Sequence, residues 1–207
     1  EDSVYTYTAA ATDVDAGASL TLSAPTLPTW LTFTPGTGVL TGMPTNTEVG
    51  THNVTLRVTD SITTPVDQSF TITVVNTNDA PTFTTTAVTA VDEDSSYSYD
   101  ANVNDVDPGP DALILSTLGL PSWLSFDAGT GILSGTPLNA DVGVDNITIR
   151  VNDGTVNVDQ TFAITIANTN DAPVVGGDTA TVGVDTSTQI NVFSNDDDED
   201  VGDSLTI

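Results

Sequence analysis

The most conspicuous absence in this sequence is positive charge. It has no lysine, and Arg57 and Arg150 are its only basic residues against 29 aspartates and glutamates, which gives a formal net charge of −27 at pH 7. Such a surface repels phosphate backbones and anionic lipid headgroups, which excludes nucleic-acid binding and membrane-surface binding, and it attracts divalent cations. Without lysine, a Schiff-base mechanism and a Lys–Asn isopeptide crosslink are excluded as well.

Cysteine is also absent, and His52 is the only histidine. Disulfides and thiolate metal sites are therefore excluded, and zinc and copper are poor candidates because both metals favour Cys or His ligands. The sequence has no initiator Met, no signal peptide and no apolar run that could cross a membrane. It opens and closes inside structured patterns, so we expect it to be a fragment of a longer protein.

What the sequence does contain is a regular alternation of apolar and polar residues. Hydrophobic residues make up 38% of the chain and alternate over 5–7, 20–22, 54–58 and 70–74, with Gly, Pro, Asn or Asp at the ends of these runs. A period of two predicts strands with one buried face, and it argues against a disordered acidic chain. Short strands in a unit of about 100 residues predict an all-β, immunoglobulin-like Greek-key sandwich.

The chain also repeats itself at a spacing of about 92 residues. Asn76–Pro81 (NTNDAP) recurs identically at 168–173. Shorter motifs recur in the same order: Glu-Asp-Ser at 1–3 and 93–95, Asp-Val-Asp at 13–15 and 105–107, and Pro-x-Trp-Leu at 28–31 and 121–124. Such internal similarity indicates two copies of one domain, and we expect Trp30 and Trp123 to fill the core between the sheets of each copy.

The repeat predicts where the domains begin and end. We expect a first domain over 1–79, a complete second domain over 80–171, and the beginning of a truncated third module over 172–207, arranged end to end. In the second copy, residues 81–91 predict a first strand with Phe83, Val88 and Val91 as its apolar residues. The first copy has no counterpart of that segment, so it is predicted to lack its first strand.

Four spaced motifs resemble those of a known family. They are Leu-Pro-x-Trp-Leu-x-Phe at 27–33 and 120–126, Gly-x-Leu-x-Gly-x-Pro at 38–44 and 131–137, Val-Gly at 49–50 and 142–143, and an acid ending a strand at Asp60 and Asp153. In this order they resemble the dystroglycan-type cadherin-like domain, also called the putative immunoglobulin domain. Residues 195–205 resemble another cadherin-like repeat family, found in very large bacterial surface adhesins.

The resemblance to cadherins implies that calcium (Ca²⁺) is held between successive domains. For the first junction it implies the ligands Glu1, Glu48, Asn76, Asn78, Asp79, Asp105, Asp107 and Asp153. For the second it implies Glu93, Asp141, Asn168, Asn170 and Asp171, completed by the third-module acids Asp198 and Asp200. Asp13, Asp15 and Asp60 would face a linker that is absent here. The linker departs from the usual cadherin pattern at Asn76 and Ala80, and no Arg-Glu follows Glu48 or Asp141, so we expect fewer ions per junction.

The chemistry of these residues supports calcium without the family. Calcium takes six to eight hard oxygen ligands, which Asp, Asn and backbone carbonyls supply from loops. In an extended Asp-x-Asp segment, Val14 and Val106 would point away and leave both carboxylates on one side. Alternatively these are solvated turn acids, since Asp and Asn are common turn formers. Recurrence of the whole set at one spacing favours calcium.

No catalytic residue recurs between the two copies. His52 has Asp145 as its repeat partner, so we expect no enzyme activity, and we expect His52 on the surface of a strand. Arg57 and Arg150 occupy equivalent mid-strand positions and are expected to form structural ion pairs.

We therefore predict an extender region of a secreted bacterial adhesin, of the cell-adhesion or biofilm type, whose partners are the neighbouring repeats. Its glycan or cell-surface ligands would bind other domains. The alternatives are a glycan-binding or homophilic module, or an accessory domain of a secreted hydrolase.

Overall fold

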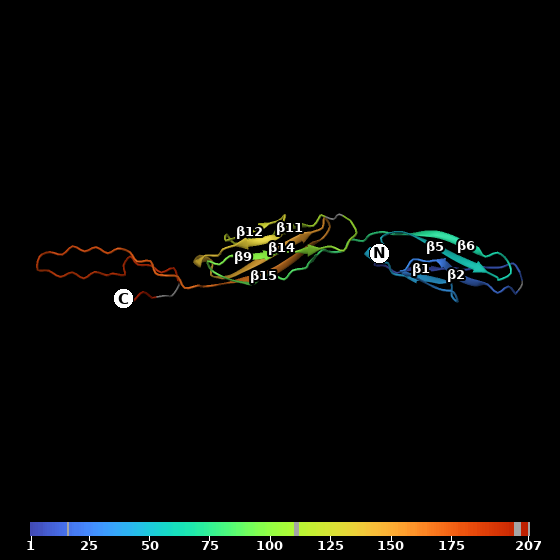
Figure 1. Cartoon of the computed structure of the whole chain (residues 1–207), viewed down its shortest axis with the longest axis horizontal. Coiled ribbons are helices and arrows are strands. Elements are labelled where there is room, and N and C mark those ends of the chain that lie inside the picture. Colours follow the sequence, from blue (N-terminus) through green and yellow to red (C-terminus); the bar gives the residue numbers. More distant parts are fainter. Residues whose placement is uncertain (16, 110–111, 201–203, 207) are drawn as a thin grey trace. The chain divides into compact units, whose positions relative to one another are not determined.

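A computed structural model describes residues 1–15, 17–109, 112–200 and 204–206 (Figure 1). The chain forms two compact units. The first comprises Glu1–Ala80 together with Asp105–Ala112, and the second comprises Pro81–Asn104 together with Leu113–Ile207. A loop of the second repeat thus belongs to the first unit, which a boundary at residue 79 does not anticipate. The predicted domain boundaries at 79 and 171 stay a prediction.

The first unit is built from two antiparallel sheets. β1 (Tyr5–Thr8), β4 (Val39–Gly42) and β3 (Leu31–Thr34) form one sheet in that spatial order. β2 (Thr21–Thr26), β5 (Gly50–Thr59) and β6 (Val66–Val74) form the other. A short 3-10 helix, η1 (Asn46–Glu48), leads into β5. Apolar residues alternate along these strands and meet between the two sheets, as a period of two requires.

The second unit repeats this plan and adds strands to it. One sheet holds β12 (Leu124–Asp127), β13 (Ile132–Gly135) and β9 (Tyr97–Asp100), in that order. The other holds β11 (Ile114–Thr117), β14 (Gly143–Asn152), β15 (Asn157–Ala167) and β8 (Ala90–Asp92). β7 (Thr82–Phe83) pairs with β10 (Val103–Asn104), and η2 (Asn139–Asp141) precedes β14. Only β8 and β15, among the described pairs, run parallel.

The prediction of one continuous first strand over 81–91 is wrong. β7 pairs antiparallel with β10, whereas β8 crosses to the opposite sheet and pairs parallel with β15. Thr85 lies at the crossing, where its hydroxyl donates to the carbonyl of Asp100 at 2.9 Å and accepts from the amide of Asn102. The crossing breaks the strand because one segment cannot pair with both sheets at once. Alternation alone does not reveal which sheet a strand joins.

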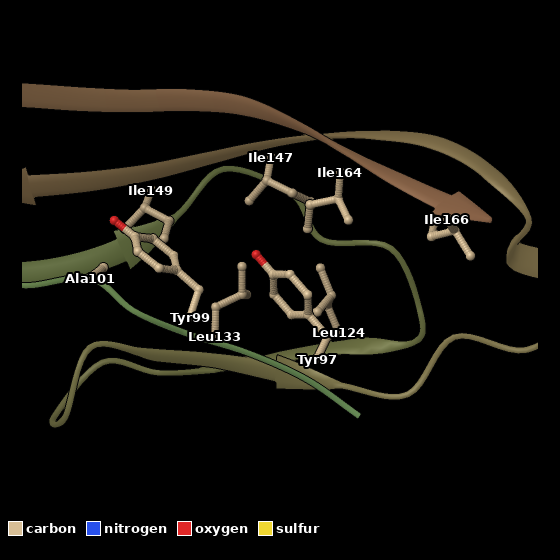
Figure 2. Packing of buried hydrophobic residues seen from close by; sticks show 9 residues of the cluster. All are labelled: Tyr97, Tyr99, Ala101, Leu124, Leu133, Ile147, Ile149, Ile164 and Ile166. Carbon is tan, nitrogen blue, oxygen red and sulfur yellow. The ribbon is translucent and has the colours of Figure 1, made fainter. Parts of the chain in front are cut away.

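The core of the second unit lies between its two main sheets. Figure 2 shows Tyr97 and Tyr99 of β9 projecting, together with the leucines of the same sheet, toward the isoleucines of β14 and β15. Ile147, Ile149 and Ile164 are fully buried. Burying each such side chain stabilises the fold by about 1.5–3 kcal/mol relative to exposure. Trp30 and Trp123 are half-buried and pack against the core clusters of their units, as predicted.

Two glycines explain one of the repeated motifs. Gly131 has a φ of 79°, in the left-handed region that an L side chain rarely adopts. At Gly135, an added Cβ would lie 2.0 Å from the carbonyl oxygen of Trp123. The Gly-x-Leu-x-Gly spacing therefore combines a tight turn before β13 with a close approach to the tryptophan segment, and Leu133 between the glycines is fully buried.

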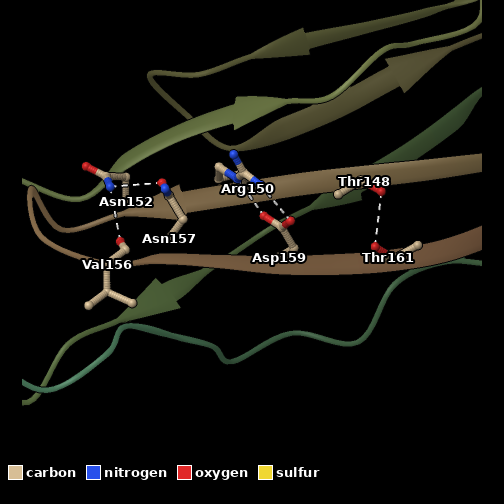
Figure 3. A network of polar contacts seen from close by, with 7 residues as sticks. All are labelled: Thr148, Arg150, Asn152, Val156, Asn157, Asp159 and Thr161. Atoms are coloured by element: carbon tan, nitrogen blue, oxygen red, sulfur yellow. Dashed lines mark hydrogen bonds and ion pairs between the residues drawn. The ribbon is translucent and has the colours of Figure 1, made fainter.

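The two arginines are used as the sequence predicts. Arg150 on β14 forms a two-pronged ion pair with Asp159 on β15, at 2.7 and 2.8 Å, and Thr148 pairs with Thr161 two residues along (Figure 3). Arg57 pairs with Asp67 in the same way. Exposed pairs of this kind contribute little to stability. Each joins two residues that lie opposite one another on neighbouring strands.

The expectation that His52 lies on the surface is wrong. Its ring is half-buried and packs edge-on against Trp30, with centroids 5.7 Å apart. Its Nε2 lies within hydrogen-bond distance of the carbonyl oxygen of Glu48. His52 is in phase with the buried residues Val54 and Leu56 of β5, so the alternation itself places it on the inner face, where η1 closes this end of the strand.

Candidate metal centre

Three acids of the second unit converge on one point. Glu93 directly follows β8, Asp171 lies four residues beyond β15, and Asp200 comes from the segment that follows. Their carboxylate oxygens all lie within 4.8 Å of one another. Glu93 and Asp200 are buried, with exposed fractions of 1% and 6%. Acids are almost never buried without a partner, so this grouping requires an explanation.

Backbone and amide donors hold these carboxylates in place. The amide of Thr169 donates to Oε1 of Glu93. The amide of Asp171 and the Nδ2 group of Asn168 donate to the two oxygens of Asp200, at 2.7 and 2.8 Å. Oε2 of Glu93 is buried and has no partner among the described residues. A buried carboxylate oxygen without a partner is destabilising unless a cation completes its environment.

The charges of the cluster oppose one another. Burial raises the pKa of Asp171, and the nearby carboxylates Asp94, Asp200 and Asp198 raise that pKa further. The folded chain therefore holds the Asp171 carboxylate at a position where ionisation is disfavoured. A bound cation would reverse this effect, because opposite charge at short range favours the ionised form.

The first unit carries part of the same arrangement one repeat earlier. The amide of Thr77 donates to Oε1 of Glu1, and the amide of Asp79 donates to Oδ2 of Asp107 at 3.0 Å. These two bonds correspond to those that Glu93 and Asp200 accept from Thr169 and Asp171, whereas the bond from Asn168 to Asp200 has no recorded counterpart. Oε2 of Glu1, Oδ2 of Asp105 and Oδ1 of Asp107 are buried and have no partner in the described part of the chain.

The Asp-x-Asp motif forms a turn and not the extended segment that the sequence suggests. The amide of Asp107 donates to Oδ1 of Asp105 at 3.0 Å, and the amide of Asp200 donates to Oδ1 of Asp198 at the same distance. Asp is well suited to such a turn because its short side chain reaches the backbone two residues on. Asp198 and Asp200 thus take the places of Asp105 and Asp107, although the third module does not repeat the sequence of the second.

Not every predicted ligand joins these groups. The carboxylate of Glu48 accepts from the amide and hydroxyl of Thr45, at 2.8 and 2.7 Å, and Asp141 accepts from the amide of Leu138 at 2.9 Å. Both acids therefore cap the first turns of η1 and η2. Hydrogen bonds from Thr45 lower the pKa of Glu48, so that carboxylate is stabilised without a metal.

The acids that end the long strands also form turns of their own. Oδ1 of Asp60 accepts from the amides of Ile62 and Thr63, and Oδ1 of Asp153 accepts from those of Thr155 and Val156. Hydrogen bonds from Thr63 and Ile62 lower the pKa of Asp60.

The remaining predicted ligands are exposed or satisfied locally. Asp13 and Asp15 are exposed, and the amide of Asp15 donates to Oδ1 of Asp13 at 2.9 Å. Asn76 is exposed as well. The side-chain amides of Asn78 and Asn170 donate to the carbonyls of Asp79 and Asp171, at 2.6 and 2.8 Å. These two asparagines shape the linker turn beside each cluster.

Two asparagines beside the clusters are not among the predicted ligands. Asn46 donates from Nδ2 to Oδ2 of Asp79 at 2.7 Å, while its own Oδ1 is buried without a partner in the structure as described. Asn139 occupies the equivalent place in the second unit, and its Nδ2 is buried without a described partner. Both asparagines begin a 3-10 turn two residues before the predicted acid, and this shared position was the signal that could have revealed them.

The residues present fit calcium. Calcium–oxygen distances are about 2.3–2.6 Å, so two ligands on opposite sides of one ion lie about 5 Å apart and neighbouring ligands lie closer. A cluster of oxygens within 4.8 Å meets that condition. Every side chain that contributes is a hard-oxygen donor, and the buried carboxylate oxygens without partners point to an ion of positive charge. Zinc and copper prefer ligands that these clusters do not contain.

The fold and the repeated motifs define a family. The model of the family described as "Putative Ig domain" matches residues 1–75 and again residues 80–167. The chain belongs to this family, and both repeats are members. The resemblance found in the motifs around the two tryptophans is thereby confirmed.

Staphylococcal adhesins are similar in sequence to most of this chain. The "Serine-rich adhesin for platelets" of Staphylococcus aureus strain MRSA252 is 32% identical over 160 residues, covering 74% of this chain and 11% of that protein. The protein of the same name in strain USA300 is 31% identical over 160 residues, covering 74% of this chain and 7% of that protein. The chain therefore spans about a tenth or less of the length of these relatives.

Among solved structures, extracellular cadherin domains 3–6 of protocadherin gamma B2 are similar to this chain. The TM-score is 0.52 at 18% identity, covering 79% of this chain and 43% of that one. This likeness shows the fold alone, and it confirms the predicted all-β, cadherin-like sandwich. No helix within the described ranges is long and apolar enough to cross a membrane.

Proposed function

We propose that this chain is a calcium-stiffened extender region of an extracellular adhesin, with calcium bound where one repeat is followed by the next. The observation that carries the proposal is the cluster of Glu93, Asp171 and Asp200, in which Oε2 of Glu93 is buried without a partner among the described residues. The first unit repeats two of its hydrogen bonds and its buried, unpartnered carboxylate oxygens. A structural role for a cation explains why the same set recurs. Solvated turn acids would not need to be buried.

The residues proposed to hold calcium in the second unit are Glu93, Asp171 and Asp200, with Asp198 beside them. In the first unit they are Glu1, Asp79, Asp105 and Asp107. When bound, calcium would supply positive charge and fix the geometry of the surrounding loops. Asn46 and Asn168 now turn their amide nitrogens toward the carboxylates, at 2.7 and 2.8 Å. Rotation of either amide by half a turn presents an oxygen, which makes both asparagines candidate ligands.

The other predicted ligands remain part of the proposal with less support. Asn76, Asn78 and Asn170 lie on the linkers that carry Asp79 and Asp171, whereas Asp153 lies in the turn between β14 and β15. Glu48 and Asp141 have the least support because their carboxylates already cap turns. We therefore propose fewer ions per junction than in typical cadherins.

The relatives support the adhesion part of the proposal. Those that match most of this chain are named as adhesins, and the chain corresponds to a small part of each. A repeated sandwich with no shared catalytic residue suits a spacer that projects a binding domain located elsewhere. We propose that the protein acts outside the cell, with the neighbouring repeats as its direct partners.

Thermal unfolding in EDTA and in millimolar calcium tests the proposal. About 10 mM calcium is about 10–100 times the dissociation constant expected for such a site, so each site adds about 1.4–2.7 kcal/mol to the folded state and raises Tm by roughly 5 °C or more for a domain of this size. For an extracellular module we expect a dissociation constant of about 10⁻⁴–10⁻³ M. Magnesium should stabilise less because it demands a smaller, octahedral site.

Matched variants separate a specific site from general screening of charge. Glu93→Gln keeps the shape of the buried side chain and removes its charge, so the calcium-induced shift of the second unit should disappear. Asp100→Asn removes an exposed carboxylate on β9, outside the cluster, and should leave the shift intact. If both variants reduced the shift equally, calcium would be acting only on net charge. Saturable binding of this chain on a glycan array would overturn the spacer role.

A further inference from the structure

The strand β11 lies at the edge of the larger sheet of the second unit. One side of β11 pairs with β14, with Leu115 opposite Val151 and Thr117 opposite Ile149. No residue in the described part of the chain pairs with its other side. β11 belongs to the repeat that contains both β8 and β15, so its open side is a feature of the sandwich itself.

The register of β11 shows which of its backbone groups face the open side. The amide of Leu118, just after the strand, donates to the carbonyl of Thr148 on β14 at 3.0 Å. In an antiparallel pair, residues that bond to the partner strand alternate with residues whose N–H and C=O groups point away from it. Ser116 therefore bonds to β14, whereas Leu115 and Thr117 direct their N–H and C=O groups to the open side. Unpaired groups of this kind are a template for another strand.

The outer face of β11 carries two exposed apolar side chains. Ile114 is 60% exposed and Leu118 is 50% exposed, and Ser116 between them is exposed as well. Residues 112–126 contain no charged residue, in a chain whose formal net charge is −27. Natural edge strands are commonly protected from pairing by a charge, a proline or a bulge. β11 contains neither a charge nor a proline, and its register with β14 is continuous.

The equivalent edge strand of the first unit is protected. Thr21 and Pro25 of β2 occupy the places of Ile114 and Leu118 when the two Leu-Pro-x-Trp motifs are aligned. The register of β2 with β5 also shifts near Pro25. A proline cannot donate a backbone hydrogen bond, and a bulge interrupts the regular edge that an incoming strand needs. The two repeats therefore share a fold and differ in whether this edge can pair.

The exposed groups of β11 are complementary to those of a second copy. If two copies of β11 pair antiparallel about Ser116, Leu115 of each copy lies opposite Thr117 of the other, so the backbone groups on the open side bond to one another. Ile114 of each copy then lies opposite Leu118 of the other, at positions where the side chains of an antiparallel pair approach most closely. One register thus satisfies the edge backbone and covers both apolar side chains.

We propose that β11 is a self-recognition edge, through which two copies of this chain join their sheets antiparallel and centred on Ser116. The contact is isologous, because each copy contributes the same strand. Residues 112–126 bring no charge against a like charge, although the chain as a whole is acidic. Only one strand edge is covered, so the contact is weak and reversible. Because the paired strands run in opposite directions, it suits copies that project from facing surfaces.

Disulfide trapping tests this proposal, because the sequence contains no cysteine. In the proposed register the two copies of Ser116 lie opposite each other with Cα atoms about 4.5 Å apart, a distance that a disulfide spans. Under mild oxidation Ser116→Cys should form a crosslinked dimer at least about tenfold faster than Ser125→Cys, since opposed thiols act at millimolar effective concentration. Ser125 is an exposed serine of the other edge strand, β12. Equal rates for the two variants would overturn the proposal.

A second pair of variants tests the register. Ile114→Cys and Leu118→Cys, mixed in equal amounts, should give mainly the mixed dimer, because these two residues face each other across the contact. Each variant alone should crosslink slowly. All reactions contain EDTA, so the outcome does not depend on calcium binding at the acid clusters. Dimers of either variant with itself that form as fast as the mixed dimer would show that β11 does not pair in this register.

Sedimentation equilibrium in EDTA measures the contact without a crosslink. We expect a monomer–dimer equilibrium that Ser116→Asp abolishes, because two like charges would then lie directly opposite each other. Ser125→Asp adds the same charge outside the contact and should leave the equilibrium unchanged. The proposal fails if the unmodified chain stays monomeric at about 1 mM, a concentration at which even a contact of about −4 kcal/mol is half formed. Equal dissociation of both variants would also contradict it, because net charge and not β11 would then control association.

Discussion

The two repeats share their motifs and differ in how completely their cores are covered. The second repeat places β8 against β15 and buries Tyr97, Tyr99 and Ile164. In the first, no described strand covers the corresponding side of β6, and the equivalent residues Tyr5 and Ile72 remain partly exposed. At the repeat spacing the counterpart of β8 falls before Glu1, so the difference in burial identifies the side chains that β8 covers in a complete repeat.

The largest expected effect concerns this difference in burial. Ile164→Ala should destabilise the second unit by about 4 kcal/mol, whereas Ile72→Ala should cost the first unit about 2 kcal/mol, because a half-buried side chain leaves a smaller cavity. Each unit has one tryptophan, so Trp30→Phe or Trp123→Phe leaves a single fluorescent reporter for urea unfolding. Equal losses in the two units would contradict the comparison.

A smaller effect should follow from exchanging one residue between the repeats. Nε1 of Trp123 donates to Asp145 at 2.7 Å, whereas Trp30 has His52 at the equivalent place and no acceptor. Asp145→His should destabilise the second unit by about 1–3 kcal/mol, the cost of leaving a buried donor unsatisfied. His52→Asp should stabilise the first unit. Chemical denaturation of both variants measures this, and a loss of stability in both would show that the tryptophan bond is not what distinguishes the two sites.

The metal cluster predicts an effect whose sign depends on calcium. Because burial and neighbouring acids raise the pKa of Asp171, the stability associated with this group is greatest below its ordinary value of 3.8 and is lost as the pH rises through its folded pKa. Asp171→Asn should therefore raise the Tm of the second unit at pH 7 in EDTA and lower it in millimolar calcium. Asp79→Asn is the equivalent variant of the first unit. There the side-chain amide of Asn46 already donates a hydrogen bond to the Asp79 carboxylate. A shift of the same sign in both conditions would count against a cation site at Asp171.

The smallest expected effect concerns the arginine–aspartate ion pairs, for which the two repeats should behave in the same way. Hydrogen bonds from Arg57 and Arg150 lower the pKa values of Asp67 and Asp159. The stability that these pairs contribute is fully present above 3.8 and is lost as the pH falls through the folded pKa values. Asp67→Asn and Asp159→Asn should each lower Tm slightly at pH 7 and have no effect at about pH 2. Thermal melts across that range check this, and a difference that persists in acid would exclude the ion pair as the cause.

Much of the fold could be predicted from the sequence because it depends on local signals. Alternation marks the long strands, the repeated motifs mark the two copies, and the position of the acid pair after each linker singles out Asp198 and Asp200. The crossing of the first-strand region between sheets could not be predicted. Phe83 and Val91 follow the same alternation of apolar and polar residues, although Phe83 pairs with β10 and Val91 pairs with β15. The enclosure of His52 could have been predicted, because His52 is in phase with Val54 and Leu56 on the inner face of β5.

The candidate metal centre was predicted by residue type better than by geometry. An Asp-x-Asp motif signals a cation whether it is extended or turned, so the wrong conformation did not affect the choice of residues. Asn46 was missed because an asparagine that begins a turn has an ordinary local explanation. Its contact with Asp79, 33 residues away, exists only in the folded chain.

The assignment of Asp105–Ala112 to the first unit has a consequence for how such proteins change by recombination. A crossover at Pro81 follows the sequence repeat, but it separates Asp79 from Asp107, whose carboxylate accepts the Asp79 amide. A transplanted repeat would keep its own sandwich and inherit the acids of whatever repeat follows it. A crossover that preserves this hydrogen bond would carry one sandwich together with the first loop of the next repeat.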